Sequence, residues 1–152
     1  MFKTSASQRI NLALQGGGAH GAFTWGVLDR LLEDGRIDFE GVSGASAGAM
    51  NAAVLASGLA AGGRDGAREA LARFWGAVGQ SASSFSNVMG ADEAGKLAPG
   101  TRILMMWAQR FSPQQLNPFD INPLRDIVVE QIDFERLRSA SPLRLFIAAT
   151  HG

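Results

Sequence analysis

The chain has 152 residues, with 14 basic and 14 acidic side chains and a formal net charge of zero. Hydrophobic residues make up 46% of it and charged residues 18%, which excludes a charged disordered segment and leaves no basic excess for contacts with nucleic-acid phosphates. Cysteine is absent and there are only 2 histidines, so disulfides and thiolate zinc sites are excluded, and we expect no metal and no cofactor.

The first residues, MFKTSASQRINLALQGGG, lack the long apolar core of a secretory signal peptide. No run reaches the roughly 18 apolar residues of a membrane-spanning helix. Residues 47–61 are apolar, but this run is too short to span a membrane and is interrupted by Asn51. We expect Asn51 on a helix surface or in packing. These features predict a soluble, cytoplasmic protein.

The first third of the chain alternates between strand and helix patterns. Residues 10–14 form a short apolar run before three glycines and predict a buried strand. Residues 19–33 carry apolar side chains at helical spacing, and Gly35 is suited to cap this helix. Residues 37–43 predict a second strand. This order is typical of a parallel α/β sheet.

Helical patterns dominate the middle of the chain. Residues 47–57 predict a helix that ends at Gly58, and residues 64–78 predict another. The second of these helices has one apolar face, formed by Ala67, Leu71, Phe74, Trp75 and Val78. Residues 79–100 are rich in Ser, Gly and Ala, so we expect a loop there.

The last third of the chain is punctuated by prolines. Residues 102–111 predict a short helix, and residues 123–131 predict another, with Pro123 in its first turn and Asn122 as its cap. The apolar run over residues 143–150, LRLFIAAT, predicts a third buried strand.

A glycine-rich turn, GGGAHG over residues 16–21, lies between the first predicted strand and helix. Its N–H groups, together with the helix start, suit a phosphate or a developing oxyanion. The G-x-G-x-x-G spacing also matches the dinucleotide fingerprint, which needs an acidic residue at the far end of the second strand. Asp38 and Glu40 lie early in that strand, so the nucleotide-binding interpretation lacks its second requirement.

A second turn, GASAG over residues 44–48, places Ser46 between Gly44 and Gly48 in a G-x-S-x-G pattern. In a nucleophile elbow the small flanking residues permit a strained turn that exposes the serine hydroxyl, although Ser46 could also be an ordinary helix cap. Both turns follow strands of one parallel sheet, so we expect them at the same edge. Acyl transfer needs this pair, a nucleophile and donors for the oxyanion.

At these motifs the chain resembles the patatin-like phospholipase family. The resemblance rests on LALQGGGAHG, GASAG, the following GAMNAA, residues 117–138 and the closing LRLFIAAT, and covers nearly the whole chain. It implies an α/β/α sandwich with a mostly parallel sheet. It also implies hydrolysis of acyl esters, often of lipids, by a Ser–Asp dyad.

The resemblance implies roles for individual residues. Ser46 matches the family nucleophile, and Gly16, Gly17 and Gly18 match its oxyanion loop. His20 stands where many members carry Arg or Lys, which makes it a candidate auxiliary residue, although a surface or capping role is the alternative.

The family's general base is an Asp in a D-G-G or D-G-A motif beyond the third strand. A literal match occurs at Asp65, but it lies soon after the serine, where an Asp is typical of a helix start. We therefore expect residues 1–152 to be the front portion of a single patatin-like acyl-hydrolase domain, incomplete at its carboxyl end. The segment with the catalytic Asp would not be in this chain, and a partner chain or symmetry mate could complete the fold.

A second arrangement of the catalytic groups stays open. His151 follows the third predicted strand and could act with Ser46, as in α/β-hydrolases. Asp120, Asp126 or Asp133 would then be the third member.

The sequence thus predicts a serine acyl hydrolase of lipase, esterase or phospholipase A type. It would cleave carboxyl esters of lipids through an acyl-enzyme and make peripheral contact with a membrane surface. Because the base is missing, a catalytically incomplete lipid- or acyl-binding fragment is the alternative. A Rossmann-like nucleotide-binding domain is a third.

Overall fold

The computed structural model describes residues 8–88 and 122–149. It divides into two compact units, one made of Met1–Trp75 with Val128–Gly152 and the other of Gly76–Ile127. The sheet and both glycine turns belong to the first unit.

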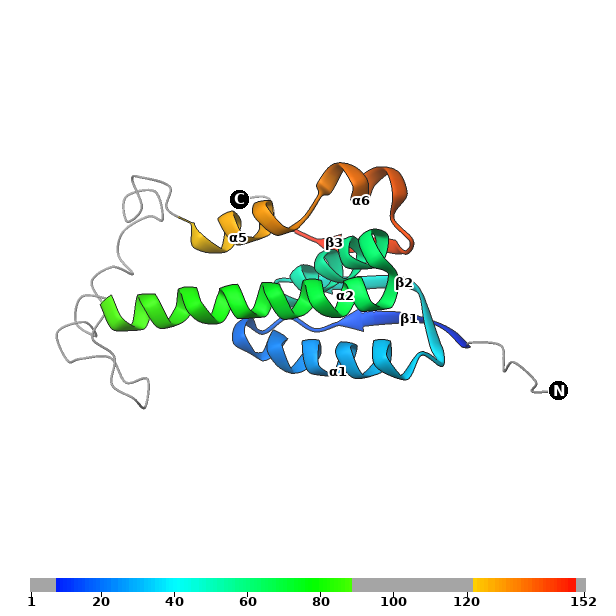
Figure 1. The fold of residues 1–152 in the computed structure, drawn as a ribbon, viewed down its shortest axis with the longest axis horizontal. Helices are drawn as coiled ribbons and strands as arrows, with labels where there is room; N and C mark the ends of the chain where they lie inside the picture. The colour runs from blue at the N-terminus through cyan, green and yellow to red at the C-terminus, as the bar shows by residue number, and fades with distance from the viewer. Residues whose placement is uncertain (1–7, 89–121, 150–152) are drawn as a thin grey trace. The chain divides into compact units, whose positions relative to one another are not determined.

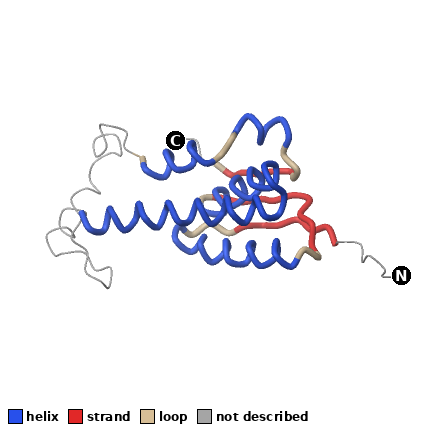
Figure 2. The backbone as a smooth tube through the Cα atoms, in the orientation of Figure 1, coloured by secondary structure: helices blue, strands red, loops and turns tan. Residues whose placement is uncertain are grey.

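Three parallel strands form the sheet in the order β1-β2-β3, where β1 is Gln8–Leu14, β2 is Ile37–Ala45 and β3 is Arg144–Ala148 (Figures 1 and 2). Leu14 pairs with Gly44, and Ala45 pairs with Ala148, so the three strands end at the same edge. The α/β class and the parallel sheet are as predicted, although β3 is shorter than expected.

Helix α1 (Gly21–Asp34) follows a short 3₁₀ turn, η1 (Gly18–His20). It ends where the sequence predicted, because Gly35 adopts φ 73° and donates its N–H back to the last turn. Leu28 and Leu32 are buried and fix the inner face of the helix.

Helix α2 (Ala47–Val88) consists of two helical segments joined at Gly62 and Gly63, where the backbone is not helical. The first segment continues past Gly58, where the sequence predicted an end. A Cβ on Gly58 would lie 2.5 Å from the Cα of Ala67, so this glycine allows the two segments to pack closely and does not terminate a helix.

The second segment of α2 confirms the helix predicted over residues 64–78 and continues to Val88. The loop prediction is therefore wrong for residues 79–88. Serine is tolerated inside this helix because its hydroxyl can bond to the preceding turn, as Ser83 does with the carbonyl of Gly79 at 2.9 Å. The rest of the predicted loop, residues 89–100, and the short helix predicted over residues 102–111 lie outside the described residues.

The core forms where the first segment of α2 packs on the sheet. Val42, Ala52, Ala56 and Leu143 are its buried members. The side chains packed against them are Leu12, Leu14, Phe39, Leu59, Leu137 and Leu145. This packing fixes the position of α2, and with it the turn that precedes α2.

The predicted helix after Asn122 is present as α5 (Pro123–Gln131), and the Asn122 side chain accepts the backbone N–H three residues later at 3.0 Å. A further helix, α6 (Phe134–Ala140), was not predicted. The Asp133 carboxylate caps it in the same way, accepting a backbone N–H at 2.9 Å. An Asp followed by FERLRSA was the available signal for this helix.

Candidate active site

Ser46 lies in the sharp turn between β2 and α2. β2 extends to Ala45, two residues beyond the predicted strand, so the serine follows the strand directly. Among the described residues, Ser46 is the only non-glycine residue with a positive φ, at 52°. Such a backbone is strained for an L-residue, whereas an ordinary helix cap adopts the extended region. The conformation therefore favours the nucleophile elbow over the capping alternative.

The two glycines beside Ser46 are required by close backbone contacts. A Cβ on Gly44 would lie 2.5 Å from the carbonyl carbon and oxygen of Gly48. A Cβ on Gly48 would lie 2.2 Å from the carbonyl oxygen of Leu14, at the end of β1. No larger side chain fits at either position, so the G-x-S-x-G pattern here is a packing requirement.

The glycine-rich turn after β1 lies against the serine. A Cβ on Gly16 would be 3.2 Å from the Cβ of Ser46 and 2.9 Å from the carbonyl oxygen of Ala45. Gly17 and Gly18 follow with φ values of 139° and 59°, which only glycine adopts readily. The two turns predicted to meet at one edge of the sheet are thus brought together.

This geometry can bind negative charge beside the serine hydroxyl. Gly17 and Gly18 lie at the start of η1, which α1 follows directly, and helix starts leave N–H groups without intrahelical partners. These donors and the positive end of α1 suit an oxyanion or a phosphate. Ser46, Gly17 and Gly18 are all exposed, so a substrate can reach them.

His20 supports the glycine turn. Its side chain is exposed and makes no capping bond to α1. Its Nδ1 instead lies 3.0 Å from the carbonyl oxygen of Gly17, and since a carbonyl only accepts, Nδ1–H is the donor. The backbone N–H of His20 donates to the same oxygen at 3.2 Å. His20 thus holds the conformation of the loop.

No side chain in residues 8–83 or 122–149 forms a hydrogen bond with the Ser46 hydroxyl. Asp65 lies at the opposite edge of the sheet, because its neighbour Arg64 donates to the carbonyl oxygen of Ile37, the first residue of β2, at 2.7 Å. The carboxylate of Asp133 is occupied as the cap of α6. The structure therefore gives no support to either aspartate as the base.

The other candidates for a catalytic array lie elsewhere. His151 and Asp120 fall outside the described residues, and Asp126 lies in α5, in the second unit. The absence of the catalytic aspartate from this chain stays a prediction.

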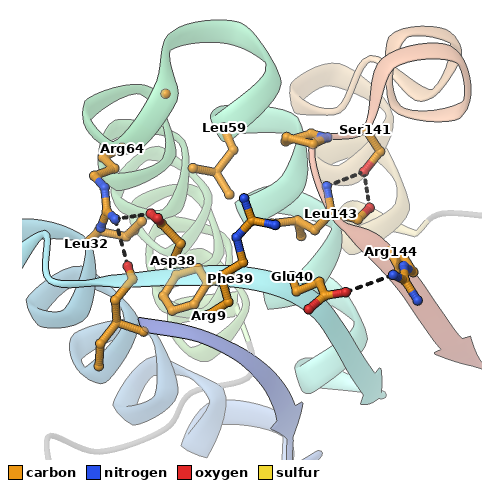
Figure 3. Close-up of a pocket in the computed structure, with 13 residues that line it drawn as sticks. Arg9, Leu32, Asp38, Phe39, Glu40, Leu59, Arg64, Ser141, Leu143 and Arg144 are labelled. Carbon is orange, nitrogen blue, oxygen red and sulfur yellow. Dashed lines mark hydrogen bonds and ion pairs between the residues drawn. The ribbon is translucent and has the colours of Figure 1, made fainter. Parts of the chain in front are cut away.

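A pocket of about 630 Å³ opens at the amino edge of the sheet, away from Ser46 (Figure 3). Its carboxylates are paired with arginines: Asp38 with Arg64, and Glu40 with Arg144, the latter at 2.8 Å. Neither acidic residue lies at the carboxyl end of β2, where a dinucleotide site would need it. The geometry thus gives the nucleotide-binding interpretation no support.

The sequence left Asn51 between a helix surface and packing, and the structure places it in packing. Asn51 is fully buried and joins α2 to α1 through its side-chain amide, a role that the sequence did not predict. A polar side chain within the apolar run over residues 47–61 was the available signal.

Two further features are absent from the described part of the chain. No group of three His, Cys, Asp or Glu residues there is arranged to hold a metal ion. No helix there has the length and apolar character needed to cross a membrane. The cytoplasmic location stays a prediction.

Residues 12–150 match the family model for patatin-like phospholipases. The chain belongs to the patatin-like phospholipase family. The match includes both glycine turns and all of the sheet except the start of β1, and it associates this patatin-like chain broadly with lipid acyl hydrolysis. No curated protein and no solved structure matches the chain.

Proposed function

We propose that the chain hydrolyses carboxyl esters of lipids, with Ser46 as the nucleophile and the Gly16–Gly17–Gly18 turn as the oxyanion hole. The observation that carries this proposal is the strained Ser46 backbone, with φ 52°, directly beside Gly16 at the carboxyl edge of the sheet. Strain of this kind persists where the surrounding structure enforces it, and it exposes the hydroxyl.

The reaction has two steps. The Ser46 Oγ attacks the ester carbonyl carbon, its proton passes to a general base, and the carbonyl oxygen becomes an oxyanion that accepts from the N–H groups of Gly17 and Gly18. Collapse of the intermediate releases the alcohol, which takes up the proton, and leaves the acyl group on Ser46. Water then attacks the acyl-enzyme with the same base, releasing the fatty acid and restoring the serine.

The base is a carboxylate supplied from outside the described residues, by another segment or by a partner chain. This assignment agrees with the Ser–Asp dyad that the family resemblance implies. It also agrees with the position of Asp65, which lies at the far edge of the sheet.

The apolar surface of α1 supports contact with a lipid surface. Phe23 and Val27 lie one turn apart on α1 and are 79% and 45% exposed. They follow the glycine turn by a few residues, so apolar groups inserted into a lipid interface there would bring the substrate toward Ser46.

A fluorophosphonate and a chromogenic short-chain ester test the proposal. We expect labelling at Ser46, and we expect Ser46→Ala to lower kcat by about 1000-fold or more. Ser43→Ala is the matched control, because the Ser43 hydroxyl donates to the carbonyl oxygen of Leu12 on the neighbouring strand at 3.4 Å. Equal rates for the chain and Ser46→Ala would overturn the nucleophile assignment.

A non-catalytic lipid- or acyl-binding fragment is the second candidate. It is favoured by the lack of a hydrogen-bonded base at Ser46 among the described residues. Unlabelled protein that still retains a fatty-acyl ligand would support it.

A further inference from the structure

Asn51 is the one polar residue among the largest fully buried side chains of the described structure, with an exposed fraction of 0%. Both ends of its amide are bonded. Nδ2 donates to the carbonyl oxygen of Gly21 at 2.9 Å, and Oδ1 accepts from the indole Nε1–H of Trp75 at 2.9 Å. Since an indole N–H only donates and a carbonyl only accepts, this pair of partners fixes the orientation of the amide.

These two bonds join three segments around the candidate site. Gly21 is the first residue of α1, directly after the glycine turn and η1. Asn51 lies on α2 little more than one turn after Ser46, and Trp75 lies on the second segment of α2. One side chain therefore connects the end of the loop at Gly21 to the helix that follows the serine.

Packing strengthens the connection. A Cβ on Gly21 would lie 2.7 Å from the Trp75 ring and 2.8 Å from the Cβ of Ala47. Ala47 immediately follows Ser46. The start of α1 at Gly21 is therefore packed between the Trp75 indole and Ala47. The Trp75 ring is itself held edge-on to Phe74, with ring centroids 5.5 Å apart.

We propose that Asn51 is a positioning residue for the acyl-transfer site, and this inference rests on the proposed function. Through Gly21 and Trp75 it fixes the spacing between the N–H groups of the glycine turn and the Ser46 hydroxyl. It touches neither substrate nor reacting atoms. An apolar side chain at this position would fill the space but would leave α1 without this hydrogen bond.

The kinetic test compares Asn51→Leu and Asn51→Asp with Leu55→Ala. Leu55 lies on the same helix and is equally buried, but it takes no part in the hydrogen-bonded network. With each variant assayed below its unfolding temperature, we expect both Asn51 variants to lower kcat by about 10- to 100-fold, because small displacements of reacting groups are that costly. KM should change by less than about threefold, and Leu55→Ala should keep kcat within about twofold despite its lower stability.

The pH profile adds a signature that a purely structural role would not produce. When it is ionised, the carboxylate of Asn51→Asp can accept from Trp75 but cannot donate to Gly21. Protonation at low pH restores a donor, so the activity of Asn51→Asp relative to the unsubstituted chain should rise as the pH falls. Asn51→Leu should show no such rise.

Hydrogen–deuterium exchange of the peptide covering residues 16–25 decides the proposal independently of activity. We expect exchange there to be about tenfold faster in Asn51→Leu and unchanged in Leu55→Ala. If the unsubstituted chain fails to react with the fluorophosphonate, the proposed function fails, but this comparison still tests the connection. Unchanged exchange in Asn51→Leu would overturn the positioning role, as would unchanged kcat in an active chain.

Discussion

Gly48 lies directly against Leu14, so close that a methyl group on Gly48 would sit 2.2 Å from the Leu14 carbonyl oxygen. This contact joins the end of β1 to the first turn of α2. The positions of the glycine turn after β1 and the serine before α2 are therefore fixed relative to each other by backbone atoms, and do not depend on flexible side chains.

Gly48→Ala should destabilise the protein by about 2–3 kcal/mol, because the added methyl group must displace the backbone of β1 or α2. Gly26→Ala is the matched control: Gly26 is on exposed α1 surface, and a Cβ there meets nothing within 4 Å. This control should gain about 0.5–1 kcal/mol from helix propensity. Urea denaturation measures the stability of both variants. Similar unfolding midpoints for Gly48→Ala and Gly26→Ala would contradict the close contact at Gly48.

His20→Ala should lower kcat by about 3- to 10-fold, since one neutral hydrogen bond contributes roughly 1 kcal/mol. The bond lost is the one from Nδ1 to the Gly17 carbonyl oxygen. His20→Asn should recover most of the activity, because its side-chain N–H can occupy a place close to that of Nδ1. Equal losses in the two variants would show that the imidazole acts in another way.

Asp65→Asn should leave fluorophosphonate labelling and kcat within about twofold of the unsubstituted chain. Asp65 lies near Arg68, whose pKa is raised chiefly by its hydrogen bond to Asp29 and less by Glu33 and Asp65. The change therefore removes a minor surface charge. A 100-fold loss of kcat with an unchanged Tm would instead identify Asp65 as the base.

The pair Asp34–Arg36 predicts a pH-dependent contribution to stability. The Arg36 Nε donates to Asp34 Oδ2 at 2.8 Å, and this hydrogen bond lowers the pKa of the Asp34 carboxyl below its ordinary 3.8. A carboxyl whose pKa is lower in the folded state stabilises it above the unfolded-state pKa, and this contribution is lost as the pH falls through the folded-state pKa.

Arg36→Met should therefore lower Tm slightly at neutral pH, and the difference should disappear as the pH falls below the ordinary carboxyl pKa of 3.8 and through the lower folded-state pKa of Asp34. The effect is small because both groups lie at the surface. Thermal unfolding followed by circular dichroism at several pH values measures it. A constant difference across this range would show that the pair does not act through the ionised carboxyl.

The elements with local signals could be predicted from the sequence. Gly35 ends α1, Asn122 caps α5, and the glycine turns mark the ends of β1 and β2, because each depends on neighbours within a few residues. Gly58 was misread because a glycine that ends a helix and one that lets two helical segments pack look alike in a sequence. Only the contact with Ala67 distinguishes them.

The candidate site likewise has parts that the sequence predicts and parts that it does not. The Ser46 turn and the Gly16–Gly18 turn carry recognisable spacing, and their meeting follows from parallel strands. The bonds from Asn51 to Gly21 and Trp75 join residues 30 and 24 positions apart, so no local pattern contains them. They depend on how the second segment of α2 returns along the first.

That return is made at Gly62 and Gly63, near the edge of the sheet opposite Ser46. Gly63 has φ 62° and ψ −146°, a backbone open essentially to glycine alone. The first segment carries the chain away from the serine, and the second brings Trp75 back to Asn51. One extra residue at the start of the second segment would rotate its side chains by about 100° and turn the indole away from Asn51. The number of residues in a distant bend is therefore part of what specifies the site.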